Sequence, residues 1–437
     1  MEPVQDRLVL EDEEARFLAK EFGHPLYVLD EAIFRNGIRK YKAAFEAAWP
    51  NCELTYASKA NSTLALLAIA AQEGCRIDCA SEGELRAALA AGVPADRIHL
   101  HGNCKRESEL DFALSCGVSQ IVVDNREELE YLGSVKASLP ELLLRIAPAV
   151  DPETNIKIST GQSDTKFGFC MADGAAEAAV DYCLERNLPL VGLHCHVGSQ
   201  LMNPEAQING GRILARFAAR MLNEKGWKAK VLNPGGGMGV SYRPQDHPMS
   251  VEDYCKILVA GILQELEGTG LEPQLVQEPG RSLVAPAGLT LYQVGAVKKV
   301  VFEGGSRTYA CVHGGLADNP RPALYGASHP VTHVAQLPRE SADAAVFTVS
   351  GRHCETDLLF ADVSLPGDLK KGDFLQVLLT GAYNACMASQ YNRYPRPRAV
   401  MKRLSGAWEI VQESDSWEDI FARENLPSDL QTQPCTD

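Results

Sequence analysis

The chain has 437 residues, of which 45% are hydrophobic and 23% charged, an ordinary composition for a soluble globular protein, and this length predicts two domains. A formal net charge of −15 argues against nucleic acid as a partner, and no apolar run approaches the ~18 residues of a membrane span, so no membrane partner is expected. The 13 scattered cysteines, with an acidic N-terminus that lacks signal-peptide features, predict a reducing, cytoplasmic location.

In chain order, a strand-like segment, HPLYVLD (24–30), is followed by β-rich runs that alternate with amphipathic helical stretches. From residue 53 the β-rich runs are ELTYAS, RIDCAS, IHLHGN, QIVVDN, LLLRIAP, LVGLHCHVGS, KVLNPGGG and QLVQEPG. Eight strand-plus-helix units over about 230 residues predict an α/β fold, a closed (β/α)8 barrel of the TIM type, over residues 36–285. An open doubly wound sheet is the alternative, because periodicity does not show whether a sheet closes.

After residue 285 the pattern changes to β-rich runs separated by turns rich in Gly, Pro and Asp, with almost no helix. The runs are LTLYQVGAVKKVVFE, RTYACVHG, AAVFTVSG, FLQVLLTG and WEIVQES. This pattern predicts a C-terminal antiparallel β domain. We expect the early HPLYVLD strand to pair with it, so that this second domain comprises residues 1–35 and 286–437.

Polar and glycine residues gather at the carboxyl ends of the predicted barrel strands, which converge on one mouth in a parallel barrel. They are Lys59, Asp78, His101, Arg145, His194, His196, Gly235, Gly236, Gly237, Glu278 and Arg281. The glycines of PGGGMG would let backbone N–H groups approach a phosphate, with Gly280 added to the same cradle, although such turns are as often purely structural.

The two histidines of HCHVGSQ (194–200) suggest a metal, but they alternate along a strand without a third convergent ligand in the sequence, so we predict no metal. An amine at Lys59, a phosphate cradle, a flat imidazole and the carboxylate of Glu278 instead match the requirements of pyridoxal phosphate. In a dry pocket near other cations, the pKa of Lys59 is expected to be lowered.

The sequence also resembles the fold-type III pyridoxal-phosphate decarboxylases, and within them the diaminopimelate decarboxylases, over nearly the whole chain. The matching motifs, in family order, are YASKAN, DCASEGEL, ISTGQSDTKFG, HCHVGS, GGGMG, EPGR, DNPRPALYGASH, HCET, GAYNACMASQYN and PRP. This resemblance implies decarboxylation of meso-2,6-diaminopimelate to L-lysine and CO2, the last step of lysine biosynthesis. It also implies a homodimer with a shared active site.

The same resemblance implies a role for each matching residue. Lys59 and Cys354 are the catalytic residues, with Cys354 as proton donor, and Cys354 and Glu355 come from the neighbouring subunit. The implied cofactor-binding residues are Lys59, Asp78, His196, Ser199, Gly235, Gly236, Gly237, Glu278, Gly280, Arg281 and Tyr383. The implied substrate-binding residues are Arg281, Arg321 and Tyr325 at the distal carboxylate, Glu355 at the distal ammonium, and Tyr383.

Other activities stay open. A related decarboxylase of D-ornithine, D-lysine or carboxynorspermidine would have no use for two arginines, and an alanine-racemase-like enzyme would lack the HCET and GAYNACMASQYN segments. A catalytically silent regulatory homologue is opposed by the presence of Lys59, Glu278 and Cys354. The run after Cys354 is one residue shorter than is usual in the family, and Tyr394 replaces the usual arginine before Pro395, so both loops depart from the pattern.

Overall fold

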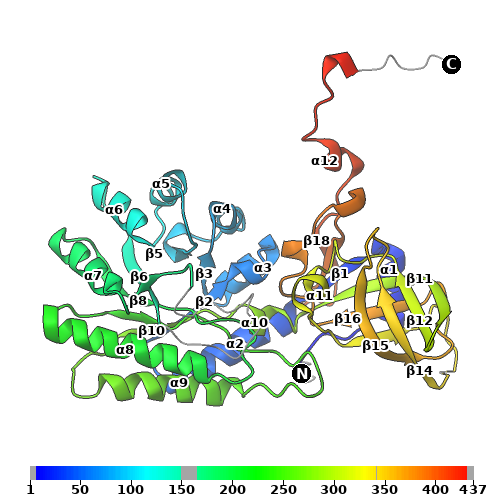
Figure 1. Cartoon of the computed structure of the whole chain (residues 1–437), viewed down its shortest axis with the longest axis horizontal. Helices are drawn as coiled ribbons and strands as arrows, with labels where there is room; N and C mark the ends of the chain where they lie inside the picture. Colours follow the sequence, from blue (N-terminus) through cyan, green and yellow to red (C-terminus); the bar gives the residue numbers. More distant parts are fainter. Residues whose placement is uncertain (1–5, 149–164, 341, 431–437) are drawn as a thin grey trace.

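A computed structural model describes residues 6–148, 165–340 and 342–430, and Figure 1 shows a barrel ringed by helices beside a smaller β-rich body. The barrel strands are β2 (Cys52–Ala57), β3 (Arg76–Cys79), β4 (Ile98–Leu100), β5 (Gln120–Val123), β6 (Glu141–Ala147), β8 (Leu190–His194), β9 (Val231–Asn233) and β10 (Gln274–Gln277). Each strand pairs in parallel with the next, and β10 pairs with β2 to close the ring. The predicted barrel is therefore confirmed, and the open-sheet alternative is wrong.

The barrel is covered by helices that follow its strands. They are α3 (Leu64–Gln72), α4 (Glu82–Ala90), α5 (Glu107–Cys116), α6 (Arg126–Ser134), α7 (Ala175–Glu185), α8 (Glu205–Lys225) and α9 (Val251–Leu266). After β10 there is only the four-residue α10 (Arg281–Val284), and α2 (Glu31–Ala48), which precedes the first barrel strand, packs against α9, α10 and α3. A helix from before the barrel thus takes the eighth position.

Helix α2 shows why its sequence suits that position. The Asp30 side chain accepts a hydrogen bond from the backbone N–H of Ile33 in the first turn of the helix. This bond satisfies one of the backbone N–H groups that have no partner within the helix. Phe34, Ile38 and Phe45 are fully buried, at the spacing that keeps side chains on one helical face. Burial of this stripe against the barrel fixes the helix where the short α10 leaves the strands uncovered.

Inside the barrel, an apolar layer lies below the carboxyl ends of the strands. It consists of Val122, Leu143, Val191, Val231 and Val276, one from each of five neighbouring strands. Because side chains two residues apart on a strand share a face, the next inward positions are polar: Arg145 after Leu143, Asn233 after Val231, and Glu278 after Val276. The layer therefore closes the barrel beneath these polar groups.

The second body is a nine-stranded sheet. Its strands are β1 (Leu26–Asp30), β11 (Gly288–Phe302), β12 (Gly305–Val312), β13 (Val331–Val334), β14 (Ala344–Ser350), β15 (Leu358–Pro366), β16 (Phe374–Leu378), β17 (Arg398–Lys402) and β18 (Trp408–Gln412). As expected, β1 joins this sheet, pairing with β11 and β17.

The expectation of an antiparallel sheet is wrong for two of its pairings. The pairs β1–β17 and β12–β14 are parallel, so the sheet is mixed. A short hairpin forces two strands to run antiparallel, but β12 and β14 are joined by a long crossover that includes α11 (Arg321–Tyr325) and β13. That crossover carries Arg321 and Tyr325 to the face of the sheet next to the barrel.

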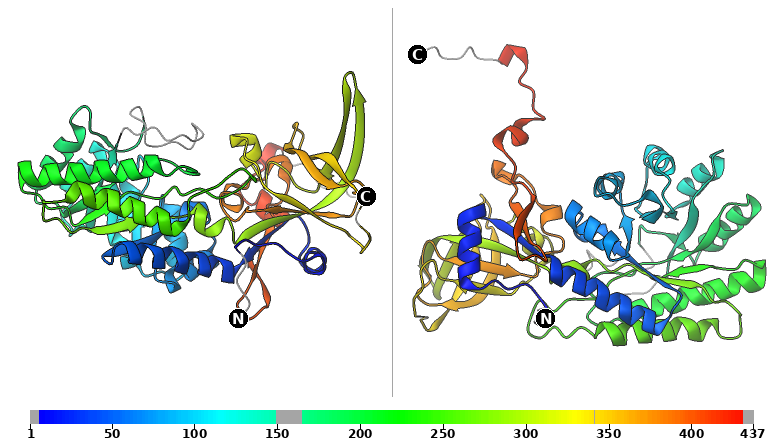
Figure 2. Two further views of the ribbon diagram at one scale, coloured as in Figure 1. Left: turned by 90° about the horizontal axis from the view of Figure 1, so that it is seen from below. Right: turned by 180° about the vertical axis from the view of Figure 1, so that it is seen from behind.

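The remaining elements are peripheral. They are α1 (Asp12–Phe22), β7 (Phe169–Cys170) beside β6, and α12 (Trp417–Phe421). In Figure 2 the segment that carries α12 extends away from both bodies. Within the described ranges, no helix combines the length and the apolar character needed to cross a bilayer.

Candidate active site

A cavity of about 430 Å³ lies between the carboxyl ends of the barrel strands and the second sheet. The predicted site residues on its wall are Lys59, His196, Ser199, Glu278, Arg281, Arg321, Tyr325 and Tyr383. Also on the wall are Ala80, His101, Gly102, Asn103, Arg145, Lys166, Phe167, His194 and Met387. Both bodies of the molecule contribute, so the site depends on their packing against each other.

Lys59 does not end its strand but lies in the one-turn 3₁₀ helix, Ser58–Ala60, that follows β2. Two hydrogen bonds join this turn to the second body: Tyr383 N–H donates to the Ala60 carbonyl at 2.7 Å, and the Asn61 side chain donates to the Gly381 carbonyl at 2.9 Å. Tyr383 has a φ of +59°, which marks its loop as a tight turn. The lysine and the tyrosine are therefore held together at the mouth.

The expected lowering of the Lys59 pKa is wrong. Burial does lower the pKa, but the negative charges of Asp78 and Glu278 and the nearby Tyr383 outweigh burial and raise it above its usual value. The sequence expectation counted cations such as Arg145, which acts in the lowering direction, and gave no weight to Asp78. Without a bound aldehyde, the lysine is thus an ammonium ion held by acids.

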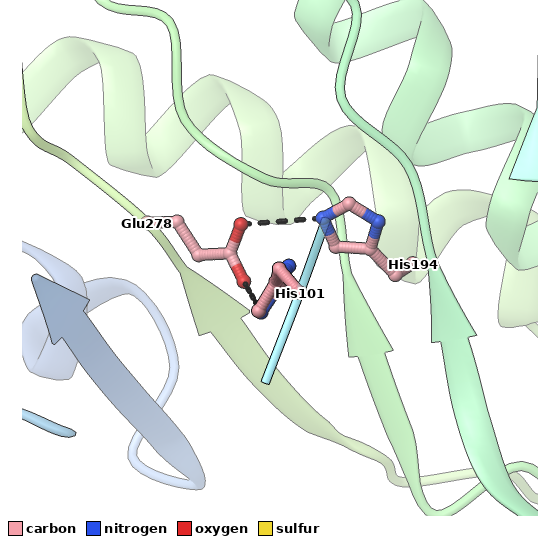
Figure 3. Close-up of side chains that lie close together, drawn as sticks. All are labelled: His101, His194 and Glu278. Carbon is pink, nitrogen blue, oxygen red and sulfur yellow. Dashed lines mark hydrogen bonds and ion pairs between the residues drawn. The ribbon is translucent and has the colours of Figure 1, made fainter. Parts of the chain in front are cut away.

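Glu278 is the most heavily contacted acid of the cavity (Figure 3). Its Oε2 lies 3.2 Å from Nε2 of His194, and its Oε1 lies 3.2 Å from Nε2 of His101 and accepts from the Asn233 amide at 2.6 Å. Burial alone would raise the pKa of Glu278, but the two histidines hold the pKa well below its usual range. The carboxylate therefore stays ionised deep in the barrel.

The two histidines beside Glu278 are electrostatically different. Burial lowers the pKa of His194 to about 4, so this imidazole is neutral. Burial also opposes protonation of His101, but Asp78 and Glu278 outweigh it and raise the pKa of His101.

The nitrogen and oxygen atoms of His101, His194 and Glu278 lie close enough together to ligate a cation, and they are the one such group among the described residues. The absence of a metal stays a prediction.

His196 is set apart from this group. Its Nδ1 accepts a hydrogen bond from the Gly236 N–H at 3.3 Å, and the ring lies on the cavity wall. Burial, with the positive charges of Lys59 and Arg145, moves the pKa of His196 well below its usual value. A neutral, flat imidazole thus faces the space beside Lys59.

The glycines of the GGG turn mainly allow close packing of the backbone. A Cβ atom on Gly236 would lie 2.1 Å from the Glu278 carbonyl oxygen, and one on Gly235 would lie 2.6 Å from the Cys195 carbonyl oxygen. The N–H of Gly235 donates to the Asn233 side chain at 2.9 Å, and that of Gly236 is taken by His196. Phosphate binding by Gly235, Gly236, Gly237 and Gly280 stays a prediction, since none of the four lies on the cavity wall.

Two arginines of the cavity wall lie close to the ring of Tyr383. The guanidinium carbon of Arg281 is 4.7 Å from the centre of that ring, and the guanidinium carbon of Arg321 is 5.7 Å from it. Both side chains are buried, and among the described residues neither forms an ion pair. Nε of Arg321 has no hydrogen-bond partner there. Burial and the charge of Arg281 lower the pKa of Arg321, so this part of the cavity needs an anion.

Two predicted residues, Cys354 and Glu355, do not line the cavity. Both are exposed, and the Glu355 carboxylate accepts from the Tyr391 hydroxyl at 2.7 Å. The shortened run after Cys354 is closed by Asp357, whose carboxylate accepts from the N–H groups of His353 at 3.0 Å and Leu316 at 2.8 Å. The loop is therefore held in place, but it contributes no residue to the cavity wall of its own chain.

Several cavity residues could not be assigned from sequence. Beside the cavity, Asn233 is the last residue of β9 and donates to Glu278, but no sequence motif singles it out for that contact. On the cavity wall, Phe167 lies in a loop and Met387 ends the 3₁₀ helix Ala385–Met387, and neither belongs to a periodic pattern that would place it. Residues 158–164 of the ISTGQSDTKFG motif lie outside the described residues.

The cavity thus combines a lysine on its wall, a buried ionised acid and two buried arginines without ion pairs among the described residues. These groups suit the class of barrel enzyme that binds an aldehyde cofactor and an amino-acid substrate. A sequence profile for "Pyridoxal-dependent decarboxylase, pyridoxal binding domain" matches residues 35–285. The chain belongs to this family of pyridoxal-dependent decarboxylases.

Individual relatives agree with this family. Diaminopimelate decarboxylase of Bacillus subtilis is 39% identical over 413 residues, covering 93% of this chain and 92% of the relative. The crystal structure of diaminopimelate decarboxylase from M. jannaschii in co-complex with L-lysine has a TM-score of 0.89 at 31% identity, covering 98% of each chain. Lysine/ornithine decarboxylase from Vibrio vulnificus, complexed with putrescine, has a TM-score of 0.74 at 27% identity, covering 90% of this chain and 99% of that one.

Proposed function

We propose that this protein is a pyridoxal-phosphate-dependent carboxy-lyase that converts meso-2,6-diaminopimelate to L-lysine and CO2. The observation that carries the proposal is the pair of buried arginines, Arg281 and Arg321, which share the cavity wall with Lys59 and form no ion pair among the described residues. Diaminopimelate is an amino acid at both ends, so a second carboxylate remains for the arginines when one end meets Lys59. The many diaminopimelate decarboxylases among the relatives support the same substrate.

The cavity residues fit pyridoxal phosphate. Lys59 offers the amine, His196 a flat neutral ring beside it, and Glu278 a carboxylate that stays ionised, while Ser199 lies on the wall as a hydroxyl donor. Behind the cavity wall, buried Asp78 has no hydrogen bond to its Oδ1, but its negative charge acts on both Lys59 and His101. When bound, the cofactor supplies an electron sink for the pair of electrons left by the departing carboxylate.

The protein's own groups then have distinct tasks. Lys59 would hold the cofactor through its amine and release it to the substrate's amine. Glu278, as an ionised acid, would favour the protonated form of the cofactor's ring. Cys354 of the partner subunit would supply the proton that the α-carbon takes up once CO2 has left.

Arginine suits the distal carboxylate because its planar fork makes two charge-assisted hydrogen bonds with one carboxylate. A substrate without that group would leave two buried cations facing each other, at a cost of several kcal/mol. This cost disfavours D-ornithine, D-lysine and carboxynorspermidine as alternatives. The retained Lys59, Glu278 and ordered cavity disfavour a catalytically silent homologue.

The proposal includes a homodimer in which Cys354 and Glu355 complete the partner's cavity. The support is that both residues are exposed and away from the cavity of their own chain. The C-terminal segment also exposes three apolar side chains, Trp417, Phe421 and Leu426, which are 58%, 49% and 60% accessible. Together they form an apolar surface that a second copy of the chain would cover.

The proposed location is the cytoplasm. All twelve cysteines within the described ranges are free, which suits a reducing compartment.

The test is to load the purified protein with pyridoxal phosphate and supply meso-diaminopimelate, D-ornithine or D-lysine in separate reactions. Release of CO2 and formation of L-lysine are measured. We expect turnover of meso-diaminopimelate, with kcat/KM at least about 100-fold above that of either monocarboxylate. Equal turnover of D-ornithine would contradict the substrate assignment, and an inactive but cofactor-loaded protein would favour the silent homologue.

A further inference from the structure

Tyr242 is a buried tyrosine in the loop after β9, eight residues beyond the start of the PGGGMG turn, and no role has yet been given to it. Its side chain is 7% exposed, and its hydroxyl accepts a hydrogen bond from Nη1 of Arg281 at 3.2 Å. Although it does not line the cavity, it contacts a residue that does. Tyr242 is therefore placed to act through Arg281.

The hydrogen bonds of Arg281 are divided in a specific way. Its Nε and Nη2 both donate to the hydroxyl oxygen of Ser199, at 3.2 and 3.1 Å, while Nη1 donates to Tyr242. A guanidinium has five N–H bonds, one on Nε and two on each terminal nitrogen. Three are thus used, and one remains on each terminal nitrogen, the pair that binds a carboxylate end-on.

Tyr242 is itself held from both sides. Its backbone N–H donates to the carboxylate of Asp246 at 3.1 Å, which closes the loop. Its ring packs edge-on against His329, with ring centres 4.9 Å apart, and Nδ1 of His329 lies 2.9 Å from the Leu378 carbonyl. His329 and Leu378 belong to the second body, so the tyrosine is wedged between the barrel loop and that sheet.

We propose that Tyr242 is a positioning residue that fixes the fork of Arg281 for the distal carboxylate of the substrate, an inference that rests on the proposed function. The two bonds to Ser199 meet at a single oxygen, and the ring of Tyr383 limits tilting of the guanidinium, but neither contact fixes its rotation within its own plane. The third bond, from Nη1 to the tyrosine hydroxyl, fixes that rotation. Fixing the fork matters because two bonds to one carboxylate form only when the fork lies in its plane.

The test is Tyr242→Phe, which removes the hydroxyl and keeps the ring that packs on His329. Two inhibitors separate a carboxylate effect from general damage: L-lysine, which carries the distal carboxylate, and cadaverine, which is the same chain without it. We expect the inhibition constant of L-lysine and the KM of diaminopimelate to rise about tenfold, with kcat within about twofold. The inhibition constant of cadaverine should not change.

Tyr254→Phe is the matched control, because Tyr254 is also buried and its hydroxyl donates to the side chain of Gln277, away from Arg281. It should leave both inhibition constants unchanged. Equal weakening of L-lysine and cadaverine by Tyr242→Phe, no weakening of either, or loss of cofactor loading would overturn the inference. A wild-type protein that does not turn over diaminopimelate would instead overturn the proposed function, so the two failures are distinguishable.

Discussion

At the scale of single residues, the ionisation state of each cavity side chain depends on two opposing effects: burial, which disfavours the charged form, and nearby charges or hydrogen-bond donors, which can favour it. Glu278 is buried and Lys59 is partly buried, yet each keeps its charge because opposite charges or hydrogen-bond donors lie close by. His194 and His101 touch the same carboxylate, but only His101 also lies near Asp78, 3.8 Å away, and its pKa moves in the opposite direction. Contacts between acidic and basic side chains therefore set which groups around the cavity are charged.

Glu278→Gln tests the role of the central acid. The amide keeps the size of the side chain but removes the negative charge that favours a protonated pyridine nitrogen. We expect kcat to fall at least about 100-fold, with the cofactor still bound. Steady-state kinetics, with the cofactor absorbance as a check on loading, measure this, and a kcat within tenfold of the wild type would be inconsistent with the assigned role.

Residues at strand ends were predictable from the sequence, because a parallel barrel sends those side chains to one place. Lys59, His196 and Glu278, which lie one or two residues beyond β2, β8 and β10, are predicted in this way and by their motifs. Tyr242 was not, since it lies in a loop whose path depends on packing between the two bodies. Sequence alone also misjudged the pKa of Lys59, because the distance to Asp78 is a property of the folded barrel.

At the scale of elements, His99 on β4 shows what an inward-facing polar residue means for stability. It is 2% exposed, and its Nε2 lies 3.8 Å from the carboxylate of Glu53. Burial lowers the pKa of His99 to about 3, with the positive charges of His101 and Arg76 acting in the same direction. The folded barrel thus holds this imidazole in its neutral form.

This predicts a pH dependence of stability. The folded pKa is below the unfolded value of about 6.5, so as the pH falls below 6.5 the unfolded state takes up the proton first. The contribution of His99 is therefore complete above about pH 6.5, and about 2 kcal/mol of it is lost by pH 5. Urea unfolding of the wild type and His99→Gln at pH 7 and 5 should show a smaller loss in the variant.

The exposed His247 provides the control for that experiment. His247→Gln should show the same loss of unfolding free energy between pH 7 and 5 as the wild type. If His99→Gln also matches the wild type, His99 is not held neutral in the fold.

The elements differ in how well the sequence predicted them. All eight barrel strands were found, because buried parallel strands are short apolar runs separated by amphipathic helices. The mixed pairing of the second sheet was not found, because a run such as RTYACVHG does not show which way its neighbour runs. The sequence also does not show that α2 fills the eighth helical position around the barrel, because α2 precedes the strands that it covers.

At the scale of the whole molecule, the chain presents a cavity on one side and the loop with Cys354 and Glu355 elsewhere on its surface. This separation predicts complementation between two inactive variants, Lys59→Ala and Cys354→Ala. In the proposed homodimer, random reassociation would make half of the dimers mixed, and each mixed dimer would have one intact site, so about a quarter of the wild-type activity should return.

As a control, two separate preparations of the same variant, Lys59→Ala, are mixed and should remain inactive. If Cys354 acted within its own chain, every site in the mixture would carry a defect. Mixing would then restore no activity, which would contradict the shared site.

The central claim is that the cofactor is joined to the protein through the amine of Lys59, and one measurement tests it directly. The cofactor-loaded protein is reduced with borohydride and digested, and the modified lysine is located by mass spectrometry. The cavity wall carries two lysines, Lys59 and Lys166. We predict the pyridoxyl group on Lys59, and its recovery on Lys166, or on no lysine, would contradict the account.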